Sequence, residues 1–168
     1  MKISQTFIVA VVCISFAACQ LADEVEEIFP GFVVEEGKLY EVSGKSPYSG
    51  EVTDYFNDGS LKQHRTYDEG ELIHTIHYYK NGKKRSEVQH TVQGMIMTSW
   101  YESGQIEEEF TPGLIRQWYE NGQMKSRVAL DDSREYHGDM KMWNENGELI
   151  AHEIYENGHL VESLVVNN

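Results

Sequence analysis

A short motif recurs seven times between residues 56 and 160 of this chain: an aromatic residue, a few polar residues, a glycine and an aliphatic residue, with some imperfect copies. Four copies contain Asn-Gly, which is typical of type I′ hairpin turns because both central residues need positive φ. The segments between turns have strand length and are rich in Tyr, Trp, Ile, Val and Thr. The pattern predicts an all-β single domain, built as an elongated, twisted antiparallel meander of consecutive β-hairpin repeats. The predicted turn glycines are Gly59, Gly70, Gly82, Gly104, Gly122, Gly147 and Gly158.

A two-residue Asn-Gly loop also predicts which residues face each other across each hairpin. It places Tyr119 opposite Met124 and Glu120 opposite Gln123. The same offset predicts four more aromatic–aliphatic pairs, Phe56–Leu61, Tyr67–Leu72, Tyr101–Ile106 and Tyr155–Leu160. We expect this column of pairs to form the packed face of the sheet.

Three tryptophans stand one residue before this column, at Trp100, Trp118 and Trp143. Successive strand residues point to opposite faces, so these side chains are predicted on the other face of the sheet. They form the candidate interaction surface. The alternative is that they only cover the second face of a single-layer sheet.

The repeat units GLIRQWYENGQMKSR (113–127) and GMIMTSWYESGQIEEE (94–109) resemble the bacterial MORN-repeat-variant family. SPYSGEVTDYFNDGSLK (46–62) is similar to the opening unit of that family, and the resemblance covers residues 38–162. It implies a twisted sheet of hairpins and a grouping with the antitoxin components of toxin–antitoxin systems.

The first twenty residues are typical of an export signal. Lys2 precedes an apolar run over residues 7–18, which is shorter than the ~20 residues a membrane-spanning helix needs. FAAC (16–19) resembles a bacterial lipobox, which implies removal of residues 1–18 and a lipid on Cys19. We expect residues 19–37 to be the lipidated cysteine and an acidic tether, and residues 38–168 to be the repeat domain. An ordinary secreted protein is the alternative.

By the same resemblance, the absence of Asp after Cys19 favours the outer membrane, facing the periplasm. The formal net charge is −14, which opposes binding to nucleic acid or to anionic lipid head groups. It favours a protein partner with a basic patch. Whether the protein is a monomer or a dimer stays open.

Motifs for catalysis or metal binding are absent from the sequence. There is no cysteine after Cys19, no G-x-S-x-G and no phosphate-binding loop. His74 and His77 are three apart, so on a strand they point to opposite faces and cannot share one metal ion. We therefore predict no catalytic residue, no metal and no cofactor, although two carboxylates from different strands could still meet.

These observations favour a non-catalytic, membrane-anchored scaffold for protein interaction, with an antitoxin- or immunity-like role as its most specific form. The alternative is a carbohydrate- or cell-wall-binding module that uses the tryptophans and tyrosines as stacking surfaces.

Overall fold

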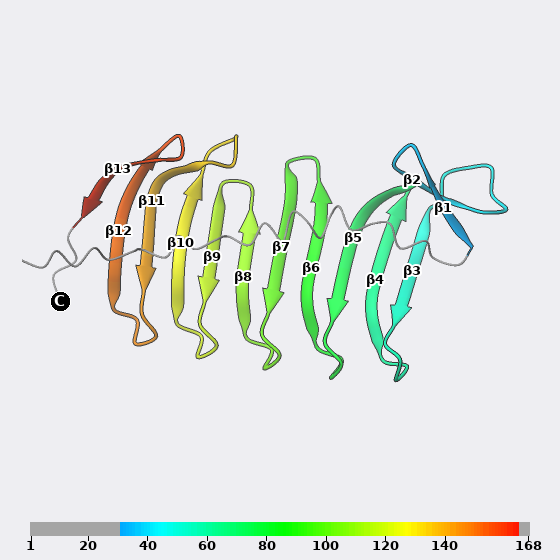
Figure 1. Cartoon of the computed structure of the whole chain (residues 1–168), viewed down its shortest axis with the longest axis horizontal. Helices are drawn as coiled ribbons and strands as arrows, with labels where there is room; N and C mark the ends of the chain where they lie inside the picture. Colours follow the sequence, from blue (N-terminus) through cyan, green and yellow to red (C-terminus); the bar gives the residue numbers. More distant parts are fainter. Residues whose placement is uncertain (1–30, 165–168) are drawn as a thin grey trace, which may run out of the picture.

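The computed structural model describes residues 31–164, and this range contains thirteen β-strands and no helix (Figure 1). The strands are β1 (Phe32–Glu35), β2 (Lys38–Glu41), β3 (Gly50–Tyr55), β4 (Leu61–Asp68), β5 (Glu71–Tyr78), β6 (Lys84–Thr91), β7 (Gly94–Trp100), β8 (Ile106–Thr111), β9 (Leu114–Trp118), β10 (Met124–Leu130), β11 (Tyr136–Trp143), β12 (Leu149–Glu156) and β13 (His159–Leu164).

Strands β3 to β13 form one eleven-stranded sheet in sequence order, each antiparallel to the next. Figure 1 shows them side by side in a single row. This confirms the predicted all-β meander of hairpin repeats. Every connection is short, because strands that are neighbours in sequence are also neighbours in the sheet.

Hairpin β1–β2 is a separate two-stranded sheet at the β3 end. Its backbone joins the large sheet through the N–H of Leu39, which donates to the carbonyl of Gly70 at 2.9 Å. Leu39, Val52 and Tyr67 form a buried cluster there. A Cβ on Gly70 would lie 2.8 Å from the Cβ of Lys38, so only glycine fits this contact. Strand β1 lies within residues 19–37, so the described strands start before the predicted domain boundary at residue 38.

One face of the sheet carries a row of buried and half-buried side chains, which we call the core face. Cross-strand pairing brings Val88, Met97, Phe110, Ile115, Val128 and Met140 into one line over β6 to β11. Ile115 and Val128 are 3% and 4% exposed. This row, rather than the predicted column of aromatic–aliphatic pairs, supplies most of the burial in the middle of the sheet.

Five turns lie along one long edge of the sheet, at the bottom of Figure 1. These lower turns are residues 56–60, 79–83, 101–105, 119–123 and 144–148. In each, the first residue donates its N–H to the carbonyl of the fifth, and the glycine N–H donates to the carbonyl of the first. Only the glycine has positive φ, so each is a type I turn closed by a glycine bulge.

The predicted type I′ geometry is therefore wrong for Asn-Gly at 81–82, 121–122 and 146–147. In two of these turns the Asn Oδ1 accepts the backbone N–H two residues later, from Lys83 and Gln123, at 2.9 Å; in the third, Oδ1 of Asn144 accepts the N–H of Glu148 at 3.0 Å. These hydrogen bonds hold the turn backbone in an ordinary conformation. The loop is three residues long, and the pairing shifts by one position.

The upper turns, along the opposite edge, are residues 69–70, 92–93, 112–113, 131–135 and 157–158. Asn157 and Gly158 both have positive φ, which confirms the predicted type I′ turn at this position alone among the Asn-Gly pairs. Glu69 and Gly70 form a second turn of this kind. The two upper turns place Tyr67 opposite Leu72 and Tyr155 opposite Leu160, as predicted.

Candidate interaction surface

The face opposite the core face carries a line of aromatic side chains, which we call the aromatic stripe. It consists of Tyr55, Tyr78, Trp100, Trp118 and Trp143, the last residues of β3, β5, β7, β9 and β11. Each follows a core-face residue, so strand alternation places it on the other face. The three tryptophans thus lie opposite the core face, but they pair with Ile106, Met124 and Leu149 and so belong to the aromatic–aliphatic column, not to the face opposite it as predicted. Successive stripe residues are two strands apart, which is roughly 9 to 10 Å.

The stripe is completed by the residue opposite each ring. Tyr55 pairs with Leu61, Trp100 with Ile106, Trp118 with Met124 and Trp143 with Leu149, whereas Tyr78 pairs with Lys84. The predicted column of aromatic–aliphatic pairs therefore exists. At three turns, however, the aromatic partner is the residue before the predicted one: Tyr55, Trp100 and Trp118. Phe56, Tyr101 and Tyr119 are the first residues of the lower turns, because those turns have three-residue loops.

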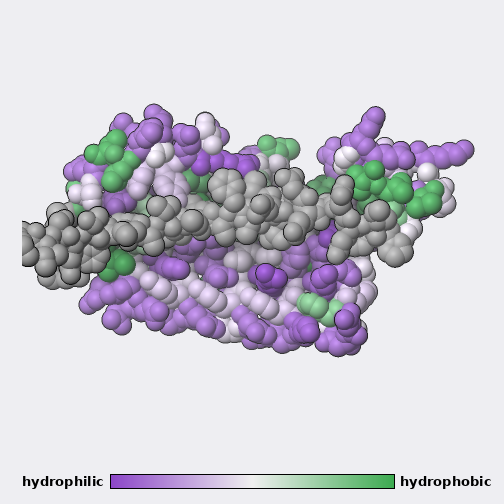
Figure 2. All heavy atoms as spheres, in the orientation of Figure 1, coloured by the Kyte–Doolittle hydropathy of each residue, from purple (hydrophilic) through white to green (hydrophobic). Residues whose placement is uncertain are grey.

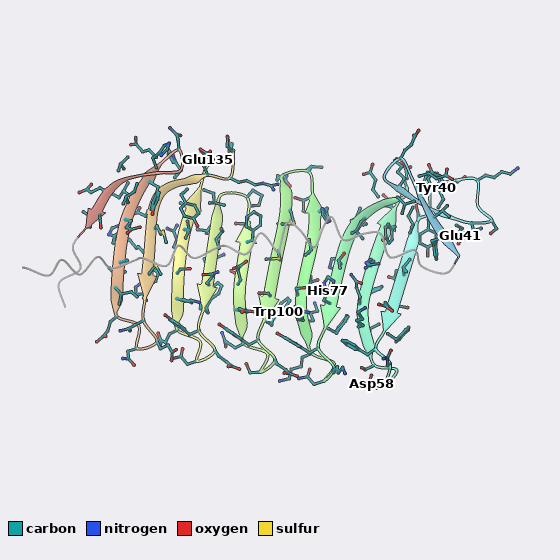
Figure 3. All side chains as sticks on the ribbon, in the orientation of Figure 1. Tyr40, Glu41, Asp58, His77, Trp100 and Glu135 are labelled. Atoms are coloured by element: carbon teal, nitrogen blue, oxygen red, sulfur yellow. The ribbon has the colours of Figure 1, made fainter. Side chains whose placement is uncertain are left out.

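Basic side chains lie against two of the tryptophan rings. Lys84 Nζ is 5.7 Å from the ring centre of Trp100, and the guanidinium of Arg116 is 6.0 Å from that of Trp118. Arg116 also pairs with Glu109 at 3.0 Å. A ring face attracts a cation through its quadrupole. The tryptophans are half-buried, whereas Tyr55 is 56% exposed. Figure 3 labels Trp100 close to the lower end of its strand.

The tyrosines that open the lower turns link each repeat to the next. The hydroxyls of Tyr79, Tyr101 and Tyr119 donate to the carbonyls of Trp100, Trp118 and Trp143, at 2.7, 2.8 and 3.0 Å. The backbone of each stripe tryptophan is thus held by the preceding repeat. Sequence reasoning missed this role because it placed the tyrosines in the strands.

Carboxylates surround this part of the surface. Glu102, Glu120 and Glu145 each stand two residues after a stripe tryptophan, at the exposed second position of a lower turn. Burial raises the pKa of the Tyr101 hydroxyl, and the negative charges of Glu107 and Glu120 raise that pKa further. Exposed carboxylates thus recur at three successive lower turns between β7 and β12, with Lys83 and Lys125 among them. Figure 2 shows mainly hydrophilic residues along the lower turns.

The core face also carries polar side chains beside the lower turns. His77 interacts with Gln63 at 2.8 Å and with Ser86 at 3.1 Å, and on β8 to β10 Glu108, Gln117 and Ser126 form a second hydrogen-bonded chain. Burial and the nearby charges of Arg65, Arg85 and Lys62 lower the pKa of His77 to about 4. His77 is therefore neutral at physiological pH, and its role here is to donate and accept hydrogen bonds.

His74 lies on the opposite face from His77, as predicted, and contacts Glu87 at 2.8 Å. Within residues 31–164 no three His, Cys, Asp or Glu side chains come together as a possible metal site. Nor does this range hold a helix long and apolar enough to cross a membrane. Cys19 and the predicted signal sequence lie outside the described residues. The predicted turn glycines all have positive φ.

A second exposed apolar area lies on hairpin β1–β2, away from the stripe. Val34 is 54% exposed and Val42 in the following turn is 66% exposed. Figure 2 shows this area in green at the β1–β2 end. It sits among Glu35, Glu36 and Glu41, so the hairpin presents small apolar side chains within acidic surroundings.

Comparison with known families finds the MORN repeat variant at residues 48–69, 93–111, 112–128 and 136–157. No curated protein matches the chain. The matched segments contain four of the five lower turns. The turn at 79–83 lies outside them, yet it has the same two backbone hydrogen bonds as the others. The chain thus carries MORN-variant repeats, and hairpin β5–β6 repeats their geometry.

Proposed function

We propose that this protein is a non-catalytic, membrane-anchored scaffold that binds a basic protein partner along the aromatic stripe. The observation that carries the proposal is the stripe itself: five aromatic residues in line on a sheet face that has no second layer among the described strands. Aromatic residues contribute most to protein interfaces, and neighbouring carboxylates favour Lys and Arg on the partner. MORN-type repeats fit this role, since they often take part in protein or membrane interaction.

A capture experiment with matched variants tests this proposal. The protein is immobilised and exposed to lysate and secreted fractions of its own host at low and high salt. One variant, E102Q/E120Q/E145Q, removes three charges beside the stripe. A matched control, E69Q/D132N/E156Q, removes three charges at the upper turns. We expect a basic protein to be captured at low salt by the unmodified protein and the control, and to be lost with the lower-turn variant.

Equal loss of the partner from both charge variants would contradict the proposal, because it would indicate attraction to the net charge alone. So would a captured partner that is retained at high salt, since pairing between exposed charges weakens as salt increases.

In its most specific form, the partner is a secreted toxin and the role is antitoxin- or immunity-like. We expect the captured partner to inhibit growth of the host, and expression of this protein in the periplasm to relieve the inhibition. Relief by a cytoplasmic form without residues 1–18, but not by the exported form, would contradict this version.

Anchoring through a lipid on Cys19 is the second part of the proposal. It places the stripe at the periplasmic side of the outer membrane. The variant C19A should abolish lipid labelling and release the protein from the membrane fraction. Retention of C19A in that fraction would contradict lipid anchoring.

The spacing of the stripe favours one alternative, binding of a linear cell-wall glycan. Planar rings that recur at roughly 9 to 10 Å match a polymer whose sugars repeat in pairs and stack on aromatic faces. Binding to purified peptidoglycan should then be saturable, insensitive to salt and lost when Trp100, Trp118 and Trp143 are replaced. The opposite salt dependence separates this function from recognition of a basic protein.

A further inference from the structure

The turns contain four Asn-Gly pairs, at residues 81–82, 121–122, 146–147 and 157–158, and all four asparagines are exposed. In such a pair the glycine nitrogen can attack the asparagine side-chain carbonyl, because glycine has no Cβ to hinder the approach. Attack requires the asparagine side chain to rotate freely. The four sites differ in this respect.

Asn81 and Asn121 are held at both ends of the amide group. The Oδ1 of each accepts a backbone N–H at 2.9 Å, from Lys83 and Gln123 respectively. The Nδ2 of Asn121 donates to the carbonyl of Glu145 at 2.9 Å, and that of Asn81 to the carbonyl of Glu102 at 3.4 Å. These acceptors belong to the next lower turn, so the array itself immobilises both side chains.

Asn146 stands in the last lower turn and lacks both restraints. In this turn Asn144 occupies the place of the tyrosine, and its Oδ1 accepts the N–H groups of Asn146 and Glu148 at 3.0 Å. The N–H of Glu148 is the group that the Asn146 side chain would otherwise bind. The sheet continues only to β13, so the described chain offers no further lower turn with an acceptor for Nδ2. Within residues 31–164 the side-chain amide of Asn146 has no hydrogen-bond partner.

We propose that Asn146 is a site of spontaneous covalent modification, by deamidation. The Gly147 nitrogen loses its proton and forms a bond to Cγ of Asn146, the Cγ–Nδ2 bond breaks, and ammonia leaves. The resulting cyclic imide takes up water at either carbonyl and opens to aspartate or isoaspartate. The only co-reactant is water. The product adds a carboxylate between Glu145 and Glu148, in the turn that follows Trp143.

We expect Asn157 to deamidate at the second-highest rate. Its side chain also has no hydrogen-bond partner in the described chain, but the N–H of Gly158 donates to the carbonyl of Tyr136 at 3.0 Å, on a different strand. The N–H of Gly147 is bonded only within its own turn, to Asn144. Release of the nucleophile is therefore easier at Gly147. The rate order that the structure assigns is Asn146, then Asn157, then Asn81 and Asn121.

Peptide mass mapping of the purified folded protein, incubated in mildly alkaline buffer, tests this order. We expect aspartate and isoaspartate to accumulate several-fold faster at Asn146 than at Asn81 or Asn121, together with a more acidic species on anion exchange. The same incubation in denaturant should bring the four rates together, because the restraints belong to the fold. Equal rates in the folded protein, or faster modification at Asn81 or Asn121, would overturn the proposal.

The variant N144Y tests the cause. Tyrosine stands at this position in three other lower turns, and it frees the N–H of Glu148 for Oδ1 of Asn146. We expect deamidation at Asn146 to slow several-fold while the rate at Asn157 stays unchanged. An unchanged rate at Asn146 in folded N144Y would overturn the assigned cause. If N144Y does not fold, the rate order within the unmodified chain still decides the proposal.

Discussion

The two long edges of the sheet are built differently. The five lower turns share one geometry, with the same two backbone hydrogen bonds and a glycine at the fourth position. The upper turns include type I′ turns, a Pro-Gly turn and a longer turn at residues 131–135. The reason is contact between repeats. Side chains of the lower turns donate hydrogen bonds to the next repeat, whereas upper turns meet neighbouring strands through the backbone of their glycines, at Gly70, Gly113 and Gly158.

The largest expected effect comes from removing the tyrosine hydroxyls that connect the lower turns. The triple variant Y79F/Y101F/Y119F loses three half-buried hydrogen bonds to backbone carbonyls. At about 0.5 to 1.5 kcal/mol each, we expect the free energy of unfolding to fall by about 2 to 4 kcal/mol in denaturant titrations. The matched control is Y78F, whose hydroxyl makes no hydrogen bond within the described chain. A triple variant as stable as Y78F would show that these three hydroxyl hydrogen bonds do not stabilise the fold.

A lower-turn glycine tests the shared backbone geometry. Gly122 has φ of 86°, and a Cβ there would meet nothing closer than Gln105 at 3.7 Å. The cost of G122A is therefore conformational, and we expect a loss of about 1 to 2 kcal/mol in unfolding free energy. Thermal and denaturant unfolding would measure it. A neutral G122A would mean that the turn readily adopts another geometry.

His77 makes stability depend on pH at the polar end of the core face. Its pKa is about 4 in the folded chain, against 6.5 for an ordinary histidine. As the pH falls from about 6.5 to 4, the unfolded chain binds this proton and the folded chain does not, so stability decreases. Because the side chain is only half-buried, we expect a loss on the order of 1 kcal/mol. The unfolding free energy of the variant H77Q, measured against pH, should lack this decrease. Identical pH dependence of stability in both proteins would contradict the lowered pKa of His77.

The smallest effect is expected at an upper turn. Residues 131–135 have the lower-turn hydrogen bonds, but Arg134 stands at the glycine position with φ of 64°. The variant R134G should relieve the strain of a left-handed backbone conformation at this residue and raise the unfolding free energy by about 0.5 to 1 kcal/mol. A matched control is S133G in the same turn, where φ is not positive and glycine should destabilise. Stabilisation by both variants would show that φ is not the cause.

The repeat pattern was sufficient to predict the meander, because the spacing of glycine-containing turns leaves only short strands between them. It also predicted the pairs that follow true type I′ turns, Tyr67–Leu72 and Tyr155–Leu160. It was wrong by one residue at the lower turns. Asn-Gly is compatible with two turn geometries, and at all three lower Asn-Gly turns a side-chain oxygen accepts the N–H of the fifth turn residue.

The sequence by itself determined the class of fold, the order of the strands and the opposite faces of His74 and His77, because these follow from local turn chemistry and strand alternation. Tertiary structure decided the rest. It moved Tyr101 and Tyr119 from the strands into the turns, put tryptophan into the stripe, and buried Ile115 and Val128 on the core face. These outcomes depend on contacts between repeats, and the periodicity of one chain does not specify which neighbouring atoms will meet.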